Sequence, residues 1–191
     1  AAFGAERNNR AVWYLRPSEP VSGLCLVASQ NHKICGSLRC WEVMVCGRSQ
    51  LLLGPLAVQP DLHGKGFGRA LVIDGLRRAQ QHNKWDFVLV SGDPDYYPRF
   101  GFVHVEDGQF IWPGALLPNV LQIRALHEVG LDNLPVGPMA VLPLAAAKTG
   151  QIYLAISAVE RVKAIKPDNA EAYYNMGIVL MDQGKLEEAI E

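Results

Sequence analysis

The 191-residue chain has no apolar run that approaches the roughly eighteen residues a membrane span needs. Residues 6–10 are all polar or charged, which is unlike the apolar run of a secretory signal. With 18 Lys and Arg against 19 Asp and Glu, the net charge of −1 gives no basic surface for nucleic acid or an anionic membrane. These absences predict a cytoplasmic protein with neither a nucleic-acid nor a membrane partner.

Cysteine is scarce and has no metal-binding spacing. The chain holds four, Cys25, Cys35, Cys40 and Cys46, and none forms Cys-x-x-Cys or joins a histidine pair that would complete a zinc set. All four fall in strand-like sequence. We therefore expect no metal, and we interpret the cysteines as small buried or half-buried residues of a reduced protein.

The glycine-rich segment His63–Gly68 follows an apolar run, Leu51–Val58, and leads into an amphipathic segment, Arg69–His82. The start of a helix has unpaired N–H groups and a positive dipole end, so its natural ligand is an anion. Gly64, Gly66 and Gly68 let the backbone turn sharply, and Lys65 and Arg69 add positive charge. This order predicts a phosphate site; the alternative is an ordinary strand-to-helix turn that is rich in glycine for steric reasons.

Two common phosphate motifs do not fit this loop. A Walker loop ends in Gly-Lys-Ser/Thr, which is absent here. A dinucleotide fingerprint would place glycine where Leu71 follows Gly66-x-Gly68. Neither a Walker nucleotide site nor a dinucleotide site is therefore indicated by this loop.

Residues 59–71 resemble the acyl-CoA pyrophosphate loop of the GNAT superfamily of N-acetyltransferases, Gln/Arg-x-x-Gly-x-Gly/Ala. Gly66 and Gly68 match the two small positions, and His63 stands where Gln or Arg is usual. The segment from Tyr97 to Phe102 resembles the family's Tyr-x-x-x-Gly-Phe signature. Residues 92–97 further resemble a bacterial subgroup of predicted acetyltransferases, and the similarity covers residues 3–105.

The resemblance implies an α/β (α+β) fold with a mixed, mostly antiparallel sheet, and acetyl-CoA as the cosubstrate. Backbone groups of a bulged strand would bind the pantetheine arm, and the loop would bind the diphosphate. The cofactor-binding residues implied are Leu56, Ala57, Val58, His63, Gly64, Lys65, Gly66, Phe67, Gly68 and Arg69.

The bulge has its own sequence signal in Gly54-Pro55. Proline has no N–H for a strand ladder and glycine suits a bulge, so pairing should be disturbed there. The other predicted elements are a helix at 7–16, strands at 23–29, 34–45, 50–58 and 87–90, a helix at 69–82, and a last strand within 116–131.

Acetyl transfer needs a proton for the departing thiolate and a polarised thioester. By resemblance, Tyr97 is the general acid, although Tyr96 beside it is a second phenol and a packing role is the alternative. Leu56 N–H is a candidate to polarise the carbonyl. The base stays open among Glu42, Asp93 and a chain of waters, and Asp93 alternatively caps the turn before Tyr97. No Cys or Ser lies in an activated setting near the loop, which favours direct attack.

The C-terminal segment repeats with a period of 34 residues: Gly150 recurs as Gly184, and Ala155 as Ala189. This is the tetratricopeptide (TPR) period. We expect an N-terminally short acetyltransferase domain at 1–133, a Pro/Gly linker at 134–149, and a partial TPR-like helical hairpin at 150–191. Such a repeat cannot bury its faces alone, so we expect it to pack on the domain, to self-associate, to bind a peptide, or to continue in a longer array.

Two functions follow from these features. The first is an acetyl-CoA-dependent N-acetyltransferase acting on a small-molecule amine or a protein amino group. The second is a catalytically weak acyl-CoA-fold/TPR protein that serves as a binding or scaffold module. Tyr97 and the glycine loop favour the first, whereas the short N-terminus, the missing base and His63 favour the second.

Overall fold

The computed structural model describes residues 15–16, 19–106, 108–112, 119–128, 131, 134 and 139–144. The predicted TPR-like hairpin at 150–191 lies outside these residues, as does nearly all of the predicted helix at 7–16.

The described chain opens with a short 3-10 turn, η3 (Ser22–Leu24), and a hairpin made of β1 (Leu26–Gln30) and β2 (Lys33–Val45). Asn31 and His32 join the strands with φ of 49° and 61°, as a tight two-residue turn requires. The strand predicted from residue 23 begins later, because Ser22–Leu24 turn and bury Leu24.

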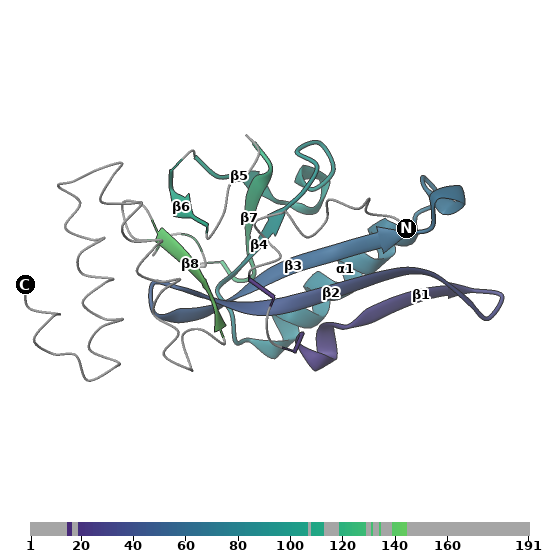
Figure 1. The fold of residues 1–191 in the computed structure, drawn as a ribbon, viewed down its shortest axis with the longest axis horizontal. Coiled ribbons are helices and arrows are strands. Elements are labelled where there is room, and N and C mark those ends of the chain that lie inside the picture. Colours follow the sequence, from purple (N-terminus) through teal and green to yellow (C-terminus); the bar gives the residue numbers. More distant parts are fainter. Residues whose placement is uncertain are drawn as a thin grey trace, which may run out of the picture.

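β3 (Arg48–Val58) pairs antiparallel with β2 and is followed by η4 (Pro60–Leu62), α1 (Phe67–His82) and β4 (Phe87–Ser91). Leu51–Leu53 of β3 pair in parallel with Val88–Val90 of β4. The predicted strand, glycine loop, helix and parallel strand are thereby confirmed. Figure 1 shows α1 lying against the face formed by β1, β2 and β3.

The remaining elements are η5 (Pro98–Phe100), β5 (Val103–His104), β6 (Phe110–Ile111), β7 (Leu121–Ala125) and β8 (Met139–Pro143). The described strands form a mixed sheet in the order β5-β7-β4-β3-β2-β8-β6. β1 and β8 both pair with the edge of β2 that faces away from β3: β1 pairs with the first residues of β2 and β8 with the last. β7 is the last strand expected within 116–131. β8 lies inside the segment predicted as a linker: its apolar residues pair with Val43–Val45, a partner that the local Pro/Gly pattern could not reveal.

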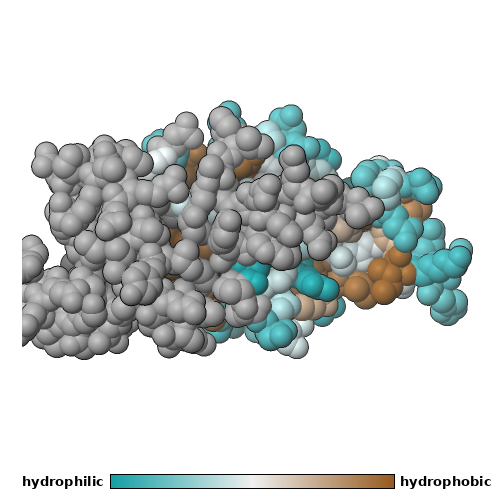
Figure 2. Space-filling model, in the orientation of Figure 1, coloured by the Kyte–Doolittle hydropathy of each residue, from teal (hydrophilic) through white to brown (hydrophobic). Residues whose placement is uncertain are grey.

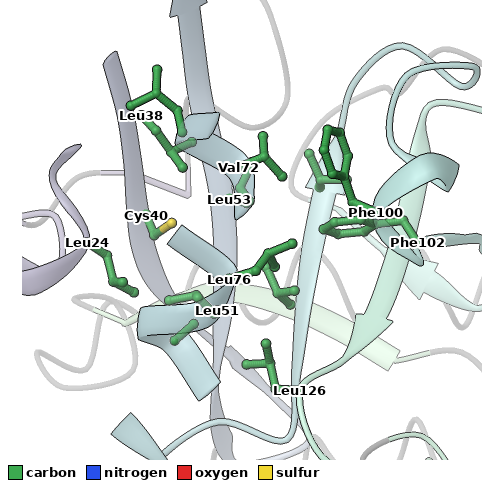
Figure 3. Packing of buried hydrophobic residues seen from close by; sticks show 14 of the residues in the cluster. Leu24, Leu38, Cys40, Leu51, Leu53, Val72, Leu76, Phe100, Phe102 and Leu126 are labelled. Carbon is green, nitrogen blue, oxygen red and sulfur yellow. The ribbon is translucent and has the colours of Figure 1, made fainter. Parts of the chain in front are cut away.

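Alternation along β3 and β4 builds one hydrophobic cluster on each face of the sheet. Figure 3 shows Leu51 and Leu53 in the cluster under α1, together with Val72 and Leu76. Leu52 joins the cluster on the opposite face. Burying such a side chain contributes roughly 1.5–3 kcal/mol, so these strands form the stable centre of the fold.

A buried polar clamp fixes where β4 begins. Gln50 is 2% exposed, and its Oε1 accepts hydrogen bonds from the backbone N–H groups of Asp86 (3.0 Å) and Phe87 (3.2 Å). Its Nε2 donates to Asp86 Oδ2 at 2.9 Å. The amide therefore meets partners at both ends and ties β3 to the first residues of β4.

Candidate functional site

β3 changes character at Gly54-Pro55. Leu38 pairs with Leu56 and Cys40 pairs with Leu53, so β3 carries one residue more than β2 between these pairs. This confirms the predicted bulge. The parallel ladder to β4 ends at the pair Leu53–Val90. Beyond it, Pro55–Val58 has no strand partner on that side among the described residues; we call this side the open edge of β3.

The loop after β3 is anchored to the β1–β2 hairpin. Gln59 N–H donates to Cys35 O at 2.8 Å, and Gln59 Nε2 donates to Ile34 O at 2.8 Å. η4 follows at once, with His63 N–H donating to Pro60 O. In Figure 2 hydrophobic surface covers the ends of β2 and β3, between this hydrophilic loop and the hydrophilic β1–β2 turn. The loop is therefore held in place before α1 begins.

The predicted glycine loop leads directly into the N-terminus of α1. Gly64 and Gly66 have φ of 75° and 88°, and a Cβ on either would meet nothing within 4 Å. They are required for backbone conformation rather than for space. Gly66 is the N-cap residue and no side chain caps the helix, so the N–H groups of Phe67 and Gly68 are available to an anion.

The three side chains of this loop differ in what they do. Lys65 and Arg69 are exposed at the helix start, where their charge adds to the helix dipole. The His63 ring instead forms a 3.0 Å hydrogen bond through Nε2 with Val58 O. His63 thereby links the loop to the end of β3, and the loop's positive charge comes from Lys65 and Arg69.

Tyr97 lies in an aromatic cluster beside the end of β4. It is 7% exposed, its ring packs edge-on against Phe102 with centroids 5.5 Å apart, and a Cβ on Gly92 would lie 2.4 Å from its Cε2. Burial is the main cause that raises the pKa of Tyr97 well above 10. Its hydroxyl has no hydrogen bond among the described residues.

Tyr96 stands at right angles to Tyr97, with ring centroids 5.1 Å apart. Its hydroxyl reaches α1, since a Cβ on Gly68 would lie 2.9 Å from Tyr96 Oη. Burial raises the pKa of Tyr96 above 10, against the opposing charge of Arg99. The two phenols therefore take separate places, Tyr97 in the cluster at β4 and Tyr96 against the first turn of the helix.

The two carboxylates considered as bases have structural partners. Glu42 accepts a hydrogen bond from Trp85 Nε1 at 3.0 Å and forms an ion pair with Lys84, and it pairs with Leu51, on the far side of the bulge from the open edge. Asp93 Oδ1 accepts from Asp95 N–H at 2.9 Å, which shapes the turn before Tyr96. Neither arrangement singles out a base.

Sequence reasoning missed the support behind this turn. Gln122 on β7 is fully buried and its Nε2 donates to Asp93 O at 3.2 Å. The signal was a polar residue between two apolar ones, Leu121-Gln122-Ile123. Such a residue needs a hydrogen-bond partner when buried, and here that partner is the turn that carries both tyrosines.

The cysteines are not part of the candidate site. Cys35 and Cys40 are buried and Cys46 is partly buried as expected, but Cys25 is exposed because it follows the η3 turn. Across the described ranges, no cluster of His, Cys, Asp or Glu is arranged to hold a metal ion. No helix in that part of the chain is long and apolar enough to cross a membrane.

The comparisons with known proteins point to acetyltransferases. Residues 21–104 match the family described as acetyltransferase (GNAT) domain. No curated protein sequence matches the chain.

Two solved structures resemble the chain in fold. A GNAT family N-acetyltransferase (YhbS) from Escherichia coli, in complex with CoA, is 28% identical over 68% of this chain and 72% of its own, with a TM-score of 0.56. A GNAT family acetyltransferase from Brucella melitensis, in complex with acetyl-CoA, is 25% identical over 73% of this chain and 79% of its own, with a TM-score of 0.51. The family match is confined to residues 21–104, and the two solved structures share the fold that contains the bulged β3, the glycine loop and the helix it starts.

Proposed function

We propose that this chain binds acetyl-CoA and transfers its acetyl group to a primary amine by direct attack. The observation that carries the proposal is the open edge of β3 beside the uncapped, glycine-formed start of α1. One offers unpaired backbone groups to an extended chain, and the other offers N–H groups to a diphosphate. An acyl-CoA has both parts.

The open edge and the loop divide the cofactor between them. Backbone groups of Leu56, Ala57 and Val58 bind the pantetheine arm, in the manner of an added strand. The turn from Gly64 to Gly68 binds the diphosphate, and Lys65 and Arg69 add charge to it. The complexes of the Escherichia coli and Brucella melitensis proteins with CoA and acetyl-CoA support this assignment.

Tyr97 is the proposed general acid. Acetyl-CoA supplies the acyl group as a thioester, and a proton must reach the sulfur when the amine replaces it. Burial raises the pKa of Tyr97, so its hydroxyl keeps a proton to give at neutral pH. The acceptor amine must arrive neutral or lose its proton to water, because Glu42 and Asp93 are occupied with structural hydrogen bonds.

The acceptor class, a small amine or a protein amino group, is proposed from the family resemblance. The cytoplasmic location and the absence of a nucleic-acid partner stay predictions. Self-association or peptide binding through residues 150–191 also stays a prediction, since that segment lies outside the described residues.

Calorimetric titration of acetyl-CoA into the full chain tests the cofactor site, with Gly66→Glu as the disrupting variant. The substitution would add negative charge to the anion site on a backbone with φ of 88°, so we expect affinity to fall at least about 100-fold. Gly47→Glu is the matched control, because Gly47 has φ of 71° and equally open surroundings in the distant β2–β3 turn. Equal losses in both variants, or no binding by folded wild-type protein, would contradict the proposal and favour the scaffold alternative.

The Tyr97→Phe variant tests the acid. Removing the hydroxyl should lower kcat at least about 100-fold in an amine-acceptor screen, because general acid catalysis contributes 10²–10⁴-fold. The phenyl ring preserves packing against Phe102, so acetyl-CoA affinity should stay within about threefold. An unchanged kcat would assign Tyr97 to packing alone.

A further inference from the structure

The hydroxyl of Tyr96 lies against the first turn of α1. A Cβ on Gly68 would stand 2.9 Å from Tyr96 Oη and 3.8 Å from Leu56 Cδ2. The oxygen therefore lies beside the helix N-terminus, and the same side of Gly68 faces the side chains of Val58 and Leu56 on β3. Gly68, unlike Gly64 and Gly66, is limited by space, and Tyr96 is what fills that space.

The ring of Tyr96 is held by its own neighbours rather than by the loop. Its centroid is 5.1 Å from that of Tyr97 and 5.4 Å from that of Phe100. The guanidinium of Arg99 covers its face at 5.0 Å, and Arg99 is itself bonded to Asp95 O. Since χ1 and χ2 are fixed by these contacts, the position of Oη is set before any ligand binds.

The hydroxyl of Tyr96 has no hydrogen bond to the described residues. It lies at the helix start, and Tyr96 is itself partly exposed. A phenol is protonated at neutral pH, and burial raises the pKa of Tyr96 further. The charged groups of the loop nearest in sequence, Lys65 and Arg69, are both positive, so the surroundings suit an anion that accepts this proton.

The geometry points to Tyr96 as a phosphate-binding residue, whose hydroxyl donates a hydrogen bond to a diphosphate oxygen at the first turn of α1. This inference rests on the proposed function. It divides the paired phenols by role: Tyr96 binds the diphosphate, and Tyr97 serves the reacting end. It also explains Gly68, because any side chain there would displace the Tyr96 hydroxyl.

Calorimetry with CoA tests the inference. Tyr96→Phe keeps the ring and its three aromatic or cationic neighbours, so we expect an unchanged Tm and about tenfold weaker CoA binding, the worth of a hydrogen bond to a charged acceptor. Gly47→Glu, in the distant β2–β3 turn, is the control and should bind CoA as the wild type does. Wild-type affinity in Tyr96→Phe would overturn the inference and leave the proposed function standing; no CoA binding by the wild type would overturn both.

Two further binding experiments test whether the Tyr96 hydroxyl contacts the diphosphate of CoA. Gly68→Ala should weaken CoA binding by pushing the hydroxyl aside, and adding it to Tyr96→Phe should cost little more, because the phenyl leaves room for the methyl group. Pantetheine, which has no diphosphate, should compete equally well in wild type and Tyr96→Phe. Fully additive losses, or a loss shared by pantetheine, would overturn the assignment to the diphosphate.

Discussion

The two halves of β3 are built for different purposes. In the first half Leu51, Leu52 and Leu53 are at most 2% exposed and pair with strands on both sides. In the second half Leu56, Ala57 and Val58 are only partly buried and pair with β2 alone. One bulge at Gly54-Pro55 separates them.

The difference shows how a sheet can hold a ligand without losing its core. A strand that is paired on both edges has no backbone group left for a ligand, and a strand that is open throughout would leave unpaired groups along its whole length. The bulge confines the open edge to the last residues of β3, next to the helix start. With the proposed function, stability and binding would thus depend on different residues of the same strand.

The largest expected effect comes from testing the two halves directly. Leu52→Ala should lower the free energy of unfolding by about 2–5 kcal/mol, because it leaves a cavity at a fully buried site. Val58→Ala, in the partly buried half, should cost less than about 1 kcal/mol. Urea unfolding of both variants measures this, and equal losses would mean that the bulge does not divide the strand energetically.

An intermediate effect concerns Cys40, which pairs with Leu53 at the boundary between the halves. Burial raises the pKa of its thiol from 9.0 to about 12. Between these values the unfolded chain loses the proton while the folded chain keeps it, so stability should fall by up to about 1.4 kcal/mol per pH unit above pH 9.

Cys40→Ala should remove this part of the slope. Unfolding under reducing conditions just below and just above pH 9 separates it from the tyrosines, whose raised pKa values act only above 10. The same slope in wild type and variant would show that the thiol at the boundary is not the titrating group.

The smallest effect on CoA affinity is expected for Arg69, the exposed charge at the start of α1 next to the open edge of β3. Arg69→Gln should weaken CoA binding roughly twofold to fivefold at low salt, because an exposed charge near a helix start is worth about 0.3–1 kcal/mol. The difference should vanish near 1 M salt. Arg77→Gln, about 12 Å further along α1, is the control and should leave binding unchanged.

The sequence predicted what depends on local chemistry. Gly54-Pro55 marks the bulge, alternation and apolar runs mark β2, β3 and β4, and the glycines mark the start of α1. Each signal lies within the element that it describes, so no distant partner was needed to recognise it.

The rest depends on partners far apart in the chain. The sequence of Met139–Pro143 is typical of a linker, and only its pairing with β2 shows that it is a strand. In sequence, Tyr96 cannot be told apart from Tyr97, and only the space beside Gly68 shows that its hydroxyl has a separate place. His63 occupies a position typical of phosphate contact, yet its ring bonds to Val58. These placements are set by packing and by hydrogen-bond satisfaction, which a local pattern does not contain.

The Gln50 clamp has a thermodynamic consequence for any ligand of the open edge. Because Gln50 ties β3 to Asp86 and Phe87, and the ladder ends at Leu53, the two strands are already apart beyond the bulge when the chain is folded. No hydrogen bond between β3 and β4 has to be broken to admit a ligand there, so the two strands are separated during folding. The open edge is preorganised, and a ligand bound along it would not have to pay the entropy and desolvation cost of opening a closed sheet.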